Sequence, residues 1–149
     1  MDNNKLMQIF GTEELVSLFE EFSQEVQSKI LSTSFKKGAQ LIIDSAKGNL
    51  GGKYKHVQNS LGTTFKGNIN VLNVGAILKR GGHLAVIANK GTKERSYTTK
   101  KGNLHKTGKI TATYFWDNAM TDTTDAVENV IFKDLETRFN NLLQKRSSI

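Results

Sequence analysis

Apolar residues recur at helical spacing near both ends of this 149-residue chain, but not in its middle. Near the N-terminus they are Leu15, Phe19, Phe22, Val26 and Ile30. Near the C-terminus they are Val127, Ile131, Leu135, Phe139 and Leu142. Steps of three and four residues are typical of amphipathic helices, which bury one face. The sequence therefore predicts a long helix at each end with a different kind of structure between them.

The first helix is expected to begin at Thr12, a suitable N-cap residue, and to end at Gly48. After the polar run at residues 32–34 the apolar pattern resumes one residue out of phase, at Phe35, Ala39, Ile42 and Ala46. This shift predicts a kink, or two consecutive helices. In the C-terminal helix, Asp122 and Asp125 approximate a capping box, which predicts a helix start at that point.

The middle of the chain alternates between polar and apolar stretches. Residues 49–66 and 89–109 are rich in Gly, Lys and Asn, which predicts two long polar loops that neighbouring molecules would order. Between them, residues 69–78 and 84–88 are expected to form two strands joined by a hairpin turn at Gly81-Gly82. Residues 111–116 would form a short strand or a lead-in turn.

These elements together predict an α+β fold. A long and possibly kinked N-terminal helix and a long amphipathic C-terminal helix would pack on an antiparallel hairpin or small sheet with long basic loops. The length suits one domain covering residues 1–149.

Positive charge is concentrated in the middle of the chain. Residues 47–109 hold thirteen of the 21 Lys and Arg residues and one acid, Glu94, for a net charge of +12, while both flanking segments are net negative. A merely solubilising surface normally mixes both signs. The segregation predicts contact with a polyanion, or docking of one subunit's middle onto another subunit's acidic ends. The residues expected at a DNA channel or an inter-subunit contact are Lys53, Lys55, Lys90, Lys93, Arg95, Lys100, Lys101 and Lys106.

No residue pattern points to catalysis. The glycine spacing from Gly62 to Gly67 approaches a phosphate-binding loop, but Asn68 stands where a lysine is needed. The three histidines have no metal-ligand spacing, and the chain has no cysteine. No apolar run approaches the about 20 residues that span a bilayer, and the N-terminus lacks a secretory signal. We therefore expect no enzymatic activity, no cofactor, no metal and no membrane contact.

Two adjacent aromatic residues, Phe115 and Trp116, precede the C-terminal helix. Neighbouring side chains at such a position can point in opposite directions, and tryptophan is enriched at protein interfaces. Both residues are candidates for a subunit interface. We expect one of them to pack inside the chain and the other, Trp116 in preference, to contact a neighbouring subunit.

Three stretches carry a resemblance to a known family. Residues 35–50 (FKKGAQLIIDSAKGNL) contain a basic residue, Gly-Ala, an apolar pair and Ala-Lys. Residues 83–95 (HLAVIANKGTKER) lead into a Gly-Thr turn, and residues 111–146 place Phe115 and Ala119 at the start of a long amphipathic helix. In this order the stretches resemble the neck and tail-completion family of siphophages, although the prolines usual in that family are missing here.

The resemblance implies a structural protein of the virion, assembled in the host cytoplasm. It would form a homo-oligomeric ring, with six as the expected number of subunits, in the neck between the portal-side head-closure ring and the tail terminator or tail tube. Genome DNA would pass through the lumen without sequence recognition. The alternative is a sequence-blind nucleic-acid-binding protein that acts through residues 47–109.

Overall fold

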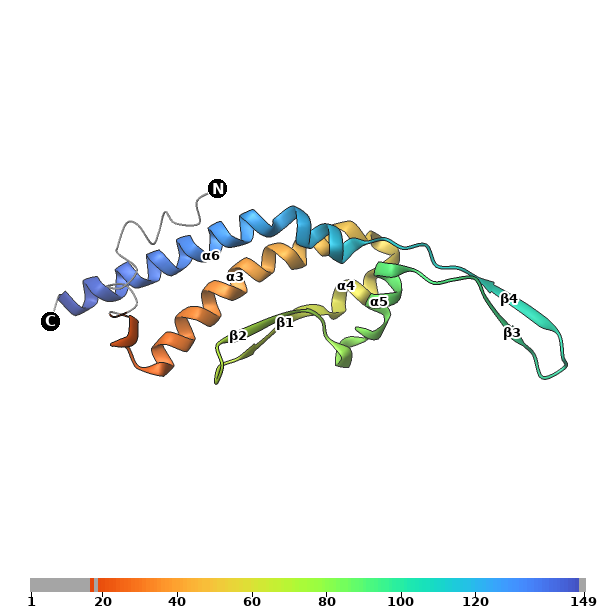
Figure 1. Ribbon diagram of the computed structural model, residues 1–149, viewed down its shortest axis with the longest axis horizontal. Helices are drawn as coiled ribbons and strands as arrows, with labels where there is room; N and C mark the ends of the chain where they lie inside the picture. The colour runs from red at the N-terminus through yellow and green to blue at the C-terminus, as the bar shows by residue number, and fades with distance from the viewer. Residues whose placement is uncertain (1–16, 18, 148–149) are drawn as a thin grey trace.

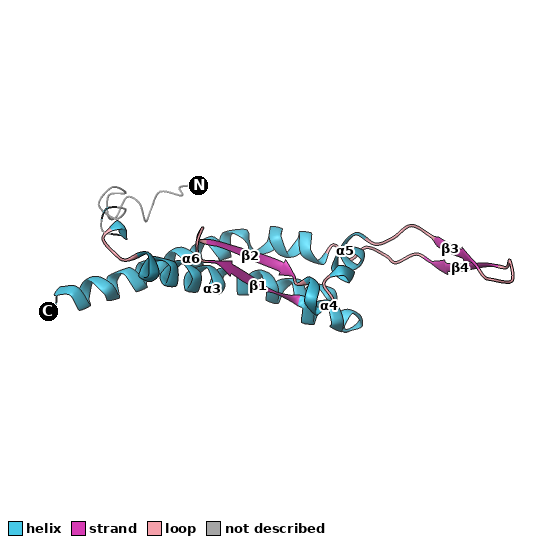
Figure 2. Ribbon diagram, turned by 90° about the horizontal axis from the view of Figure 1, so that it is seen from below, coloured by secondary structure: helices cyan, strands magenta, loops and turns pink. Residues whose placement is uncertain are grey.

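Two long helices lie side by side and run antiparallel through most of the molecule (Figures 1 and 2). They are α3 (Gln24–Leu50) and α6 (Phe115–Ser147). The computed structural model describes residue 17 and residues 19–147, with the side chains of residues 146 and 147 left out. The elements between the two helices are η1 (Gly52–Tyr54), α4 (Lys55–Ser60), β1 (Leu61–Lys66), β2 (Val71–Ala76), η2 (Leu78–Arg80), α5 (His83–Lys90), β3 (Arg95–Thr98) and β4 (Leu104–Gly108). The predicted α+β class is confirmed.

Helix α3 is continuous through residues 32–34, so two consecutive helices, one of the two structures that the shift predicts, do not meet there. The apolar pattern shifts phase because it omits Ser34 and Gly38, both of which lie on the buried face. Within this polar run the Thr33 hydroxyl donates to the Lys29 carbonyl at 2.7 Å, so the helix itself satisfies this polar side chain. The predicted cap, Thr12, lies outside the described residues. Within them, Ser23 caps α3 by accepting a hydrogen bond from the Val26 N–H.

Gly38 allows α3 and α6 to approach closely. A methyl group at this glycine would lie 2.6 Å from Cγ1 of Ile131 and 3.2 Å from Cγ1 of Val127, closer than carbon atoms pack. Val127 and Ile131 therefore turn toward α3, as the predicted C-terminal stripe requires. Further along the stripe, Phe139 is buried and meets the Phe22 ring edge to face, with centroids 6.1 Å apart.

A buried carboxylate also joins the two helices. The Asp134 side chain is only 9% exposed; it accepts hydrogen bonds from the Ser34 hydroxyl at 2.8 Å, from Arg138 Nε at 2.6 Å, and from the Lys37 ammonium. Burial raises the pKa of Asp134, but the hydrogen bonds from Lys37, Arg138 and Ser34 outweigh that cost and lower its pKa to about 2. The carboxylate therefore stays charged and anchors α6 to α3 at any ordinary pH.

Residues 49–66 are not the predicted polar loop. Helix α3 continues past Gly48 to Leu50 and ends at Gly51, whose φ of +65° suits glycine. The chain then forms η1, α4 and strand β1. This segment is ordered because Val57 and Leu61 are buried in the core, and a few well-placed apolar residues suffice for that.

The hairpin of the body also differs from the prediction. Strand β2 falls within the predicted strand at residues 69–78, but it pairs antiparallel with β1, from Leu61 opposite Ala76 to Lys66 opposite Val71. The predicted returning strand at residues 84–88 is helix α5. Ala85 and Ala88, three residues apart, both face the core, which is helical rather than strand spacing.

Helix α6 begins at Phe115, seven residues before the predicted capping box at Asp122. Near the predicted start, the Thr121 and Thr123 hydroxyls donate to carbonyls four residues earlier, so the helix backbone satisfies these polar groups. The early start places Phe115 and Ala119 in the main core, beside Ala46 of α3. The core also contains Ile43, Leu50, Val57, Leu61, Ala85 and Ala88, with Tyr54, Val74, Ala76 and Trp116 packed against it.

Candidate functional site

Residues 92–110 form an arm that projects from the helical body (Figures 1 and 2). Residues 89–109 are therefore not the predicted polar loop. Within them, strands β3 and β4 pair antiparallel, with Tyr97 opposite His105 and Thr98 opposite Leu104. Every residue of β3 is exposed, and β4 is exposed except at Gly108. The arm therefore has backbone pairing but no core of its own.

The base of the arm is held by a close backbone contact. Thr92 and Ile110 exchange hydrogen bonds, N–H to carbonyl at 2.9 Å and N–H to hydroxyl at 3.0 Å. Gly91 has a φ of +73°, and a Cβ there would lie 2.5 Å from the Ile110 carbonyl oxygen and 2.7 Å from the Ala112 nitrogen. Glycine is required on both counts, for the left-handed backbone and for the close approach. This junction sets the direction in which the arm leaves the body.

Five of the eight predicted basic residues lie on this arm. They are Lys93, Arg95, Lys100, Lys101 and Lys106, all exposed. With Lys109 and the single acid Glu94, the arm has a net charge of +5. Lys100 and Lys101 lie at the tip, in the turn between the strands. The structure thus gathers much of the basic segment onto one slender element.

The other three predicted basic residues lie on the body. Lys53 is in η1, with its ammonium 5.7 Å from the centroid of the Tyr54 ring, and Lys55 begins α4. Lys90 ends α5 and forms an ion pair with Asp117 at 2.5 Å. The carboxylate of Asp117 offsets the positive charge of Lys90, so Lys90 is less suited to contact with a polyanion than the arm residues are.

Asn89 connects α5 to the beginning of α6, a role that the sequence did not reveal. This buried side chain accepts a hydrogen bond from the Trp116 N–H at 3.0 Å and donates to Asp117 at 3.2 Å. It thereby caps a helix that starts 26 residues later. The hydrogen bond from Lys90 is the main cause that lowers the pKa of Asp117, and Asn89 adds to it.

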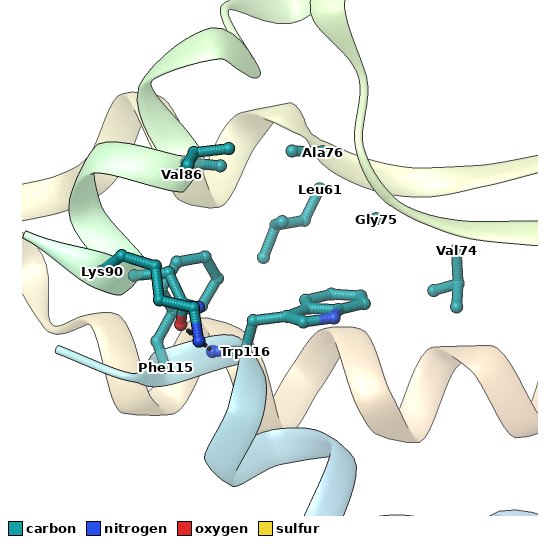
Figure 3. A pocket seen from close by; sticks show the side chains of 10 residues that line it. Leu61, Val74, Gly75, Ala76, Val86, Lys90, Phe115 and Trp116 are labelled. Atoms are coloured by element: carbon teal, nitrogen blue, oxygen red, sulfur yellow. Dashed lines mark hydrogen bonds between the residues drawn. The ribbon is translucent and has the colours of Figure 1, made fainter. Parts of the chain in front are cut away.

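An apolar pocket of about 300 Å³ lies beside this junction (Figure 3). The Trp116 side chain extends from α6 toward Val74 of β2, and Val86 and Lys90 of α5 lie at the other side. The remaining lining residues are Leu61, Gly75, Ala76, Ala85, Asn89 and Phe115. The sequence pattern could not have located this pocket, because its walls come from four separate elements, β1, β2, α5 and α6.

The two adjacent aromatic residues have different environments. Phe115 is 1% exposed and belongs to the core of the chain. Its side chain therefore has no exposed surface with which to contact a neighbouring subunit, a contact that the sequence allows for either residue. Trp116 is half-buried and lines the open pocket, with its ring centroid 6.5 Å from that of Phe115. One ring inside and the other accessible is the arrangement expected from the sequence.

Within the described residues, no group of three or more His, Asp or Glu side chains is placed to hold a metal ion. In the same part of the chain, no helix is both long enough and apolar enough to cross a membrane.

Comparisons with protein-family models, with curated proteins and with solved structures found no match to this chain.

Proposed function

We propose that the chain is a structural subunit of the head-to-tail connector of a tailed bacteriophage. Several copies would form a ring in the neck, between the portal-side head-closure ring and the tail terminator or tail tube, and the genome would pass through the lumen. The protein would be part of the virion and would have no enzymatic activity. The resemblance of residues 35–50, 83–95 and 111–146 to the neck and tail-completion family supports this proposal.

The observation that carries the proposal is the concentration of exposed positive charge on an arm outside the body. A ring around DNA requires subunits that join copies of themselves and a lumen that does not repel phosphate. An arm of net charge +5, next to a body with acidic helix surfaces, is suited to joining like subunits.

Trp116 is a second candidate contact with a neighbouring subunit or ring. A large aromatic side chain at the wall of an open apolar pocket can be covered by another protein at little conformational cost. Trp116→Ala should therefore leave the chain folded, as judged by circular dichroism, and should lower assembly. A variant that unfolds outright would assign Trp116 to the core instead.

Electron microscopy of the purified protein, together with the position of its gene, tests the connector proposal. We expect closed rings with a central opening wide enough for a DNA duplex. We also expect the gene to lie between those for the major capsid protein and the tail tube. Open filaments or monomers, or a gene far from any capsid gene, would argue against a connector.

A sequence-blind nucleic-acid-binding protein is the second candidate. The observation that favours it is the Tyr97–His105 ring pair on the arm, with centroids 5.2 Å apart and the tyrosine 52% exposed among lysines. Exposed aromatic rings on a basic surface can stack with unpaired bases, and a two-stranded ribbon fits the major groove.

Duplex binding at several salt concentrations separates the two candidates. A nucleic-acid-binding protein should lose affinity when Lys100 and Lys101 are both changed to Glu, and its salt slope should fall by about 0.9 for each phosphate contact removed. A connector subunit should bind free duplex weakly before and after the change. The replacement of Tyr97 by Ala adds a second readout, because it removes stacking without changing charge.

A further inference from the structure

The arm has a surface that its own chain leaves uncovered. Leu104 is 65% exposed, and Lys106 follows two residues later on the same face of the strand. A hairpin of two strands is marginally stable by itself in water. Extended arms with exposed apolar side chains therefore gain order when another surface covers them.

A complementary surface lies on the outer face of α6, defined here as Thr121, Asp122, Asp125, Glu128 and Phe132. These residues are all exposed, whereas Val127 and Ile131 on the other side of the helix pack against Gly38 of α3. Phe132 is 43% exposed although it is large and apolar. The outer face thus presents one aromatic residue beside three carboxylates.

The charges of the two surfaces are opposite. Residues 115–132 contain four acids and no Lys or Arg. Lys90 pairs with Asp117, but none of the ion pairs in the described part of the chain involves Asp122, Asp125 or Glu128. The arm has a net charge of +5 and no carboxylate other than Glu94. The outer face of α6 is therefore acidic and the arm is basic, so the two surfaces are complementary in charge.

The arm cannot reach this face within one molecule, because it points away from the body in both views (Figures 1 and 2). Each side of the arm, from its base to its tip, has about nine residues and reaches roughly 30 Å, at about 3.3 Å per extended residue. The acidic stretch from Asp122 to Phe132 covers only about 15 Å of helix, at 1.5 Å per residue. The arm is therefore long enough to lie along the whole face on a second copy.

From these observations we infer that the arm of one copy docks on the outer face of α6 of another copy of this chain. Leu104 covers Phe132, and the lysines at the tip and on β4 pair with Asp122, Asp125 and Glu128. Because the two surfaces differ, the contact is head to tail and leaves one arm and one face free at the ends of any open assembly. This inference deepens the proposed function, since it names the contact by which a ring would close.

Charge reversal on each surface, measured by sedimentation velocity of the full-length chain, tests the contact. The arm variant carries Lys100→Glu and Lys101→Glu, and the face variant carries Asp125→Lys and Glu128→Lys. We expect the parent to assemble and each variant to require at least about tenfold higher concentration, the factor that corresponds to 1.4 kcal/mol. Lys66→Glu with Lys79→Glu makes the same charge change as the arm variant on the body and should leave assembly unchanged.

An equimolar mixture of the arm and face variants is the decisive sample. In the mixture the unchanged basic arm of the face variant meets the unchanged acidic face of the arm variant. The two glutamates at the tip of the other arm meet the two lysines of the changed face, so the substituted positions again have opposite charges. We expect assembly to recover, and to weaken as salt rises from about 0.1 M to about 1 M, because the screening length falls from about 10 Å to about 3 Å. Recovery also proves that both variants are folded.

Three results would overturn the inference: a parent that stays monomeric at low salt, variants that assemble like the parent, or a mixture that does not recover. Loss of duplex binding in the arm variant, without any assembly by the parent, would assign the arm to nucleic acid. The connector proposal fails separately. A chain that assembles through this contact but is absent from virions would support the contact and contradict the connector. Virions that contain intact rings of the arm variant would contradict the contact and support the connector.

Discussion

The helical body and the β3–β4 arm are both built on regular backbone hydrogen bonds, but only the body buries side chains. In the body, α3 and α6 enclose a core and share the buried carboxylate of Asp134. In the arm, Tyr97 and Leu104 remain exposed, and only their strand partners hold them. The body can thus be stable alone, whereas the arm depends on what it meets. In this chain, the region without a core is also the region with the most concentrated charge.

The largest expected effect is in the body. Phe115→Ala removes a fully buried ring from the core and should lower the free energy of unfolding by about 3–5 kcal/mol. Urea denaturation followed by circular dichroism measures the loss. A change of less than about 1 kcal/mol would mean that Phe115 is not a core residue, and would return it to the candidate interface.

The junction between the two regions should be nearly as sensitive. Gly91→Ala forces a left-handed backbone on a residue with a side chain, at about 1–2 kcal/mol, and its methyl group overlaps the Ile110 and Ala112 backbone, at about 1–3 kcal/mol more. Gly51→Ala is the matched control, because Gly51 also has positive φ but has open space around it. Equal losses of unfolding free energy in the two variants would show that the backbone at the base of the arm can move to accommodate the methyl group.

Acid should weaken the body through Asp134. Its pKa is lowered from 3.8 to about 2 in the folded chain, so its contribution is complete above about pH 4 and disappears as pH falls through about 2. The contribution is about 2 kcal/mol, from a shift of nearly two pKa units. The gap in unfolding free energy between the parent and Asp134→Asn should therefore narrow over that range. If this difference in unfolding free energy stays constant with pH, the charge of the Asp134 carboxylate does not contribute to stability.

The smallest effect should be in the arm. Tyr97→Ala removes an aromatic ring as Phe115→Ala does, but it should change the free energy of unfolding of the isolated chain by less than about 0.5 kcal/mol. Because the arm buries no large side chain, we expect it to open and close locally, independently of the body. Hydrogen exchange should accordingly show fast arm amides in the monomer and slower ones in an assembly. A loss above 1 kcal/mol would show that arm and body unfold together, and would remove the contrast between them.

Several parts of the fold were predictable from local pattern. The two terminal helices, the α+β class and the strand at β2 follow from spacing, because amphipathic periodicity reports which side of an element will be buried. The charge of the arm is also visible in the sequence, since no folding changes which residues are basic. The pattern does not identify the partner of each element, so it predicts a loop where β1 lies and a strand where α5 lies.

The remaining features depended on contacts between distant residues. Ser34 and Gly38 look like interruptions of a helix until α6 lies against them, with Asp134 bound to one and Ile131 packed on the other. The start of α6 depends on Asn89, whose side chain reaches the helix only after the arm has returned to the body. The amphipathic faces and the distribution of charge along the chain are thus local properties that can be read from the residues alone. Which polar residues are buried, and where the charge is exposed, depends on the folded arrangement, because burial and capping require pairs of residues that meet only on folding.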